Sequence, residues 1–172
     1  MRPSVAVPGL SVASSRPQSR GHVTSEATAR HEDGDGGVRQ AVRMALRTTK
    51  TWFGVVLDAP DGPALAHFYA RLLGWSVFDE DSSGAAVAPS SDAGYNLACQ
   101  TAEHYARPVW PTVKGEPQMS MHLDIEVDDL DEAVAHAVEV GAELAAHQPQ
   151  ETVRVMFDPA GHPFCLYLDD DT

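Results

Sequence analysis

The sequence is poor in basic residues and in long apolar runs, and each scarcity argues against a class of function. Residues 51–172 carry four basic and 21 acidic residues. A body this acidic repels the phosphate backbone of nucleic acids, so we expect no nucleic-acid partner. No apolar run approaches the roughly 18 residues that a membrane span requires, so we expect no membrane partner either.

Cysteine is also scarce, and its two occurrences form no metal-binding motif. Cys99 and Cys165 belong to no CxxC or Cys/His zinc spacing. Two free thiols are typical of a reducing compartment, so the sequence predicts a cytoplasmic protein. The simplest interpretation of each thiol is a small buried hydrophobe. The functional alternative, for Cys165 above all, is a thiol that faces a bound ligand.

The first 49 residues contain no Trp, Phe or Tyr and are rich in Ser, Gly, Pro and Arg. Such a segment cannot build a core, so we expect a disordered tail over residues 1–49. Its basic, Ser-containing beginning weakly resembles a transit peptide. Met44, just before the stretch ALRTTKTWFGVVLD, is an alternative start of translation.

From Thr51 onward, a pattern of one strand, one helix and three strands occurs twice. The helices are GPALAHFYARLLG and LDEAVAHAVEVG, each with apolar residues at helical spacing and a closing Gly. The segments around them alternate or are rich in β-branched residues, as strands are. The sequence therefore predicts one α+β domain over residues 50–172. Its two βαβββ modules cover residues 51–100 and 119–169, joined by a connector over residues 101–118.

Two such modules should pack together and share a core, because neither can bury a sheet face alone. We expect the helices outside and a central cleft between the inner faces of the sheets. In the strand MSMHLDIEVDD, Ile125 and its apolar neighbours alternate with His122, Asp124 and Glu126. This alternation predicts that the polar side chains line the cleft. Gly54 holds the position of His122 in the first module.

Four further residues are candidates for contacts with a ligand. Gln100 and Cys165 lie in the last strands of their modules. Trp52 shares a face with Gly54, which either leaves room for a ligand or marks a bend in the strand. Trp110 lies between two prolines of the connector, where it would cover a pocket or plug the gap between the modules.

Three segments resemble the vicinal oxygen chelate superfamily, which includes glyoxalase I, bleomycin-resistance proteins and extradiol dioxygenases. They are LDAPDGPALAHFYARLLGW, MHLDIEVDDLDEAVAHAVEVGAEL and DPAGHPFCL. The closest resemblance is to the small glyoxalase-like members, over about residues 50–170. It implies that the paired modules form a cupped mixed sheet. It also implies a homodimer as one form of assembly, since relatives pair modules within a chain or swap them between chains.

In that superfamily, a divalent metal is held by side chains on the first and last strands of each module. Carried over, these positions fall on Gly54, which cannot ligate, on His122, which can, and on Cys165, where the enzymes commonly have Glu. The matching position in the strand YNLACQ stays open between Leu97, Cys99 and Gln100. The resemblance therefore implies a metal site that is incomplete in this chain.

With an incomplete ligand set, we expect a protein that binds a small organic molecule without strong metal dependence, as antibiotic-binding relatives do. The alternative is a lyase, isomerase or dioxygenase in which a divalent metal (Zn, Fe, Mn, Ni or Mg) polarises a substrate oxygen. That alternative requires about three protein ligands. Convergence of His122 with Asp124 or the cysteines at one point would favour the metal-dependent alternative. A regulatory module whose cleft is filled by its own side chains is a third hypothesis.

Overall fold

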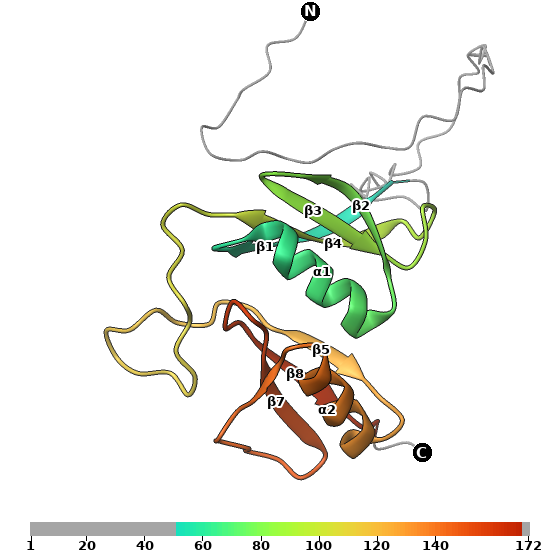
Figure 1. Ribbon diagram of the computed structural model, residues 1–172. Coiled ribbons are helices and arrows are strands. Elements are labelled where there is room, and N and C mark those ends of the chain that lie inside the picture. Colours follow the sequence, from blue (N-terminus) through green and yellow to red (C-terminus); the bar gives the residue numbers. More distant parts are fainter. Residues whose placement is uncertain (1–50, 170–172) are drawn as a thin grey trace, which may run out of the picture.

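The computed structural model describes residues 51–169, and the tail expected over residues 1–49 lies outside this range. The order of elements is βαβββ, twice (Figure 1). The first module holds β1 (Phe53–Ala59), α1 (Gly62–Leu73), β2 (Ser76–Asp81), β3 (Gly84–Ala88) and β4 (Tyr95–Thr101). The second holds β5 (Leu123–Glu126), α2 (Leu130–Glu139), β6 (Glu143–Leu144), β7 (Val153–Phe157) and β8 (Pro163–Tyr167). The predicted α+β class with paired βαβββ modules is confirmed.

Each module forms a four-stranded mixed sheet. The strand orders are β1-β4-β3-β2 and β5-β8-β7-β6. In both sheets the first strand of the module pairs in parallel with the last strand, and the other pairs are antiparallel. The parallel pairing places residues that are far apart in the sequence directly beside each other.

Both helices begin at an aspartate and end at or near a glycine. Asp61 accepts a hydrogen bond from the backbone N–H of Ala64 at 2.9 Å, and Asp129 caps α2 in the same way. These side chains satisfy backbone N–H groups that have no partner within the helix. Gly74 ends α1 with a φ of 65°, a conformation that favours glycine. Neither helix is long and apolar enough to cross a membrane, within residues 51–169.

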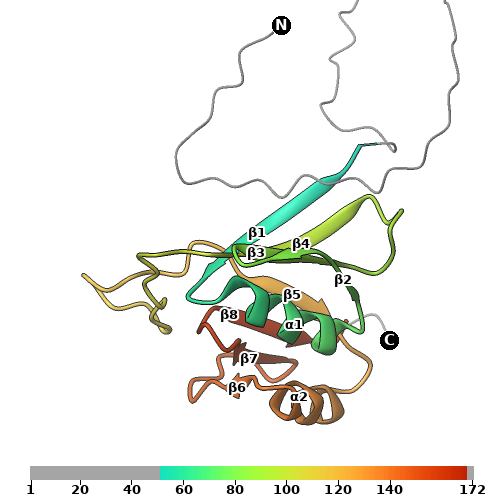
Figure 2. The same cartoon turned by 45° about the horizontal axis from the view of Figure 1, so that its top comes forward.

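Each helix lies against the apolar face of its own sheet, as expected for helices outside a cup (Figures 1 and 2). The two modules share one core, in which the ring of Phe68 from α1 meets that of Phe164 from β8 at 6.3 Å. We call the face of each sheet that points away from this core its open face. These open faces are where strands can present polar side chains.

The second module departs from its expected strands at the segment AELAAHQ. Only Glu143 and Leu144 form a strand there. Beyond them the N–H of Ala145 still donates to the carbonyl of Val155 at 3.0 Å. The side chain of Gln148 then takes the place of further ladder bonds, since its amide donates to the carbonyls of Ala145 and Val155 and accepts from the N–H of Val155. A side chain that pairs with the backbone in this way ends the strand early.

Candidate functional site

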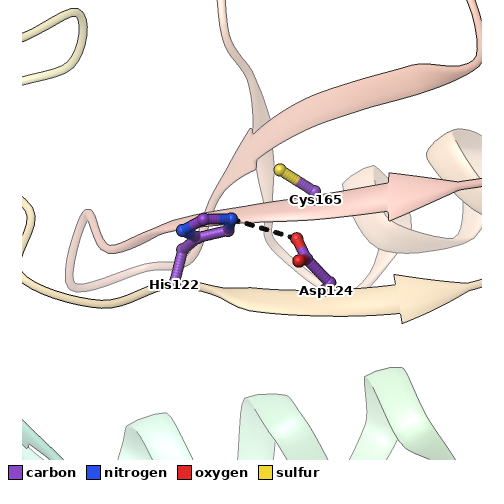
Figure 3. Close-up of side chains that lie close together, drawn as sticks. All are labelled: His122, Asp124 and Cys165. Carbon is purple, nitrogen blue, oxygen red and sulfur yellow. Dashed lines mark ion pairs between the residues drawn. The ribbon is translucent and has the colours of Figure 1, made fainter.

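Three chemically different side chains meet on the open face of the second sheet (Figure 3). His122 stands directly before β5, Asp124 lies in β5 and Cys165 lies in β8. Their ligand atoms all lie within 4.8 Å of one another. The Nε2 atom of His122 is 3.1 Å from Oδ1 of Asp124. We call these three residues the polar trio.

The trio follows from strand alternation and from the pairing of β5 with β8. Leu123 and Ile125 pack against the core, so Asp124 between them faces the other side. Asp124 is the direct neighbour of Cys165 in the parallel ladder. The structure therefore brings His122, Asp124 and Cys165 together, which is the condition that the metal-dependent alternative required.

The thiol of the trio is held in its neutral form. Partial burial raises the pKa of Cys165 to about 11, and the charge of Asp124 and its hydrogen bond with the thiol act in the same direction. The side chains of His122 and Asp124 are 38% and 59% exposed, so a ligand can reach them from solvent. The trio thus offers a carboxylate acceptor and an imidazole to one approaching molecule, with the neutral thiol beside them.

The register of the first module shows that the trio has no counterpart there. Val56 stands two residues after Gly54, as Asp124 stands two residues after His122, and Val56 pairs with Ala98. The position that corresponds to Cys165 is therefore Ala98. None of the three alternatives that the sequence left open occupies this position. Leu97 and Cys99 face the core, and Gln100 lies two residues further along β4.

Gly54 does not leave an empty space on its sheet. The side chain of Asn96, its neighbour in β4, lies where a Cβ of residue 54 would stand. The Oδ1 atom of Asn96 is buried there and has no hydrogen-bond partner among residues 51–169. The space that a side chain at position 54 would fill is therefore occupied by the side chain of Asn96. The interpretation that Gly54 leaves room for a ligand is wrong.

The remaining candidates stand apart from the trio. Gln100 donates from Nε2 to Asp58 at 2.6 Å, on the first sheet. Trp52 is exposed just before β1. Trp110 is half-buried in the connector, and its Nε1 has no hydrogen-bond partner in the part of the chain that the structure describes. Cys99 is a buried core residue, as its simplest interpretation predicted. A role for Gln100, Trp52 or Trp110 in ligand binding stays a prediction.

The enclosed space beside the trio is small. A cavity of about 10 Å³ lies next to His122 and is also lined by Tyr69 and His162. That volume suits about one water molecule. A larger molecule would therefore have to approach the trio over the open face of the sheet.

The profile of the Glyoxalase-like domain family matches residues 54–167. The fold is similar to that of a glyoxalase/bleomycin resistance protein/dioxygenase family enzyme from Burkholderia phytofirmans PsJN, at 18% identity and a TM-score of 0.50, over 67% of this chain and 95% of that one. It is also similar to a glyoxalase-related enzyme from Fulvimarina pelagi, at 18% identity and a TM-score of 0.50, over 70% of this chain and 88% of that one.

At these identities the two solved structures establish the shared fold alone. A comparison with curated proteins finds no match. The family profile spans both modules and includes all three members of the polar trio. The chain therefore belongs to the glyoxalase-like domain family of the vicinal oxygen chelate superfamily.

Proposed function

We propose that this glyoxalase-like domain binds a small organic molecule on the open face of its second sheet, with the polar trio as the anchor. The observation that carries the proposal is the convergence of His122, Asp124 and Cys165 within 4.8 Å on a face that the core does not use. Binding sites typically combine a few placed polar groups with apolar surface. The trio is matched to ligands that bear a hydrogen-bond donor for the carboxylate of Asp124.

The two open faces differ, and the difference favours an amphipathic ligand. The positions of the first sheet that correspond to the trio are Gly54, Val56 and Ala98, which are small or apolar. A homodimer that places the first sheet of one copy over the second sheet of the other would pair a polar wall with an apolar one. The exposed side chain of Val56, on the open face of the first sheet, supports such a contact, since water otherwise covers it.

The second candidate is a divalent cation at the trio, and the donor set fits one. Imidazole nitrogen, carboxylate oxygen and thiolate sulfur are all zinc ligands, and three protein ligands with one open position is the arrangement of catalytic zinc sites. The thiolate favours zinc over magnesium. When bound, the cation would supply Lewis-acid polarisation of a substrate oxygen. His122, Asp124 and Cys165 would hold it, and a lyase, isomerase or dioxygenase activity would follow from this candidate alone.

Saturation-transfer NMR on the full-length chain tests the organic ligand. The probes are a panel of small amines, alcohols and amides, recorded with the wild type, with His122→Ala and with Glu126→Gln. Glu126 shares the strand and the face of the trio but lies outside it. Signals that vanish in His122→Ala and persist in Glu126→Gln support the proposal. The absence of any signal, or signals that both variants retain, would refute the proposed ligand site.

Titration with Zn²⁺ and Co²⁺ separates the second candidate from the first. Cobalt bound through Cys165 gives a sulfur charge-transfer absorption, which Cys165→Ser abolishes and Glu126→Gln retains. If neither ion binds and neither raises the melting temperature, the metal candidate fails while the organic-ligand proposal stands. Two free thiols, Cys99 and Cys165, support a cytoplasmic location for either function.

A further inference from the structure

Asp158 is the only charged side chain that is buried within residues 51–169, with 2% exposed. It lies in the turn between β7 and β8. Its Oδ1 accepts from the backbone N–H groups of Gly161 at 2.8 Å and His162 at 2.9 Å. Its Oδ2 accepts from the hydroxyl of Tyr69 at 2.9 Å and lies 2.7 Å from Nδ1 of His162. A buried carboxylate persists only when it is paired in this way.

These contacts tie together three parts of the chain. Tyr69 belongs to α1 of the first module, and Asp158 and His162 belong to the second. Tyr105 comes from the connector, and its hydroxyl donates to the carbonyl of Ala160 at 3.0 Å and lies 3.2 Å from Nε2 of His162. Burial, then the charge of Asp158, raises the pKa of Tyr69 well above its usual value, so its hydroxyl keeps the proton that it donates.

The turn that Asp158 holds also sets where β8 begins. The N–H of Asp158 donates to the carbonyl of His162 at 3.0 Å, and Phe157 pairs with Pro163 as the first rung of the ladder. Cys165 follows three residues after His162. Because side chains alternate along a strand, a slip of one residue in β8 would turn Cys165 from the open face into the core. The fixed turn prevents that slip.

We infer that Tyr69, Asp158 and His162 form a positioning network, which holds β8 in the register that places Cys165 beside Asp124. The network also borders the site, since Tyr69 and His162 line the small cavity that His122 lines too. Through Tyr69, the first module controls the geometry of a site that the second module carries. The inference rests on the proposed function, because that proposal makes the trio the binding site. Its test, however, requires no ligand.

The test is the rate at which Cys165 reacts with Ellman's reagent in the folded full-length protein. Tyr69→Phe removes one hydroxyl from the network, and we expect it to raise the rate about tenfold, since losing a hydrogen bond to a charged group increases local opening by about that factor. Tyr95→Phe is the matched control, because Tyr95 lies in β4 and its ring contacts Trp75. Its rate should equal that of the wild type. Cys165→Ser identifies which thiol reacts.

Cys99 separates positioning from general loss of stability. It is 1% exposed in the core, so it reacts only when the domain unfolds. Faster reaction of Cys165 with Cys99 still protected supports the network as a positioning device. Equal acceleration of both thiols, or a rate in folded Tyr69→Phe within about twofold of the wild type, overturns it. Hydrogen exchange of the β8 amides in the same two variants gives a second readout: exchange as slow in Tyr69→Phe as in Tyr95→Phe also overturns the inference.

Discussion

Replacing Gly161 by alanine tests how much the packing of the connector against the turn before β8 contributes to stability. Gly161 has a φ of 95°, a conformation that side chains disfavour. A Cβ at this position would also collide with the side chain of Arg107, whose Cδ would be 2.6 Å away. Arg107 lies 5.6 Å from the centre of the Phe157 ring and 3.7 Å from Glu143. The substitution therefore carries two separate costs.

The two costs can be estimated from their causes. Holding alanine in a left-handed conformation costs about 1–2 kcal/mol. Displacing Arg107 loses a cation–π contact of about 0.5–1 kcal/mol. Its exposed ion pair with Glu143 adds little. We expect Gly161→Ala to lower the free energy of unfolding by about 1.5–3 kcal/mol, or roughly 6–12 °C in melting temperature for a domain of this size.

Gly115 provides the matched control, because its φ of 93° is nearly the same and nothing lies within 4 Å of a Cβ there. Gly115→Ala should cost only the backbone term, about 4–8 °C. Thermal unfolding followed by circular dichroism measures both variants. In an Arg107→Ala background, Gly161→Ala should cost no more than Gly115→Ala. Equal losses for the two glycines in the wild-type background would refute the collision with Arg107.

Two further predictions concern pH and helix capping. Burial raises the pKa of Cys99 to about 12, of Cys165 to about 11 and of Tyr105 to about 12. Above about pH 9 the unfolded chain therefore loses protons that the folded chain keeps, and the free energy of unfolding should fall with rising pH. Urea unfolding at about pH 7 and about pH 10.5 measures this fall, and a flat profile would contradict it. Asp129→Ala should cost about 1 kcal/mol, because Asp129 accepts from two backbone N–H groups of α2. Asp128→Ala should change stability by less than about 0.5 kcal/mol, and equal losses for the two aspartates would contradict the capping assignment.

Features that depend on local periodicity could be predicted from the sequence. The alternation around Ile125 predicted which side chains leave the core, and the spacing of apolar residues predicted both helices. The closing glycine predicted for the first helix is Gly74, which ends α1. Each of these features rests on residues a few positions apart, whose preferences the backbone geometry fixes directly.

Features that depend on the register between strands could be identified only from the tertiary structure. The counterpart of Cys165 in the first module is Ala98, which no local pattern distinguishes from its neighbours in YNLACQ. The register of one strand against another is set by the packing of side chains from distant segments. The same holds for the buried Asp158, whose partner Tyr69 comes from the other module. The sequence alone determined the repeated modules and the polar face of β5, while only the folded chain decided that His122, Asp124 and Cys165 meet there.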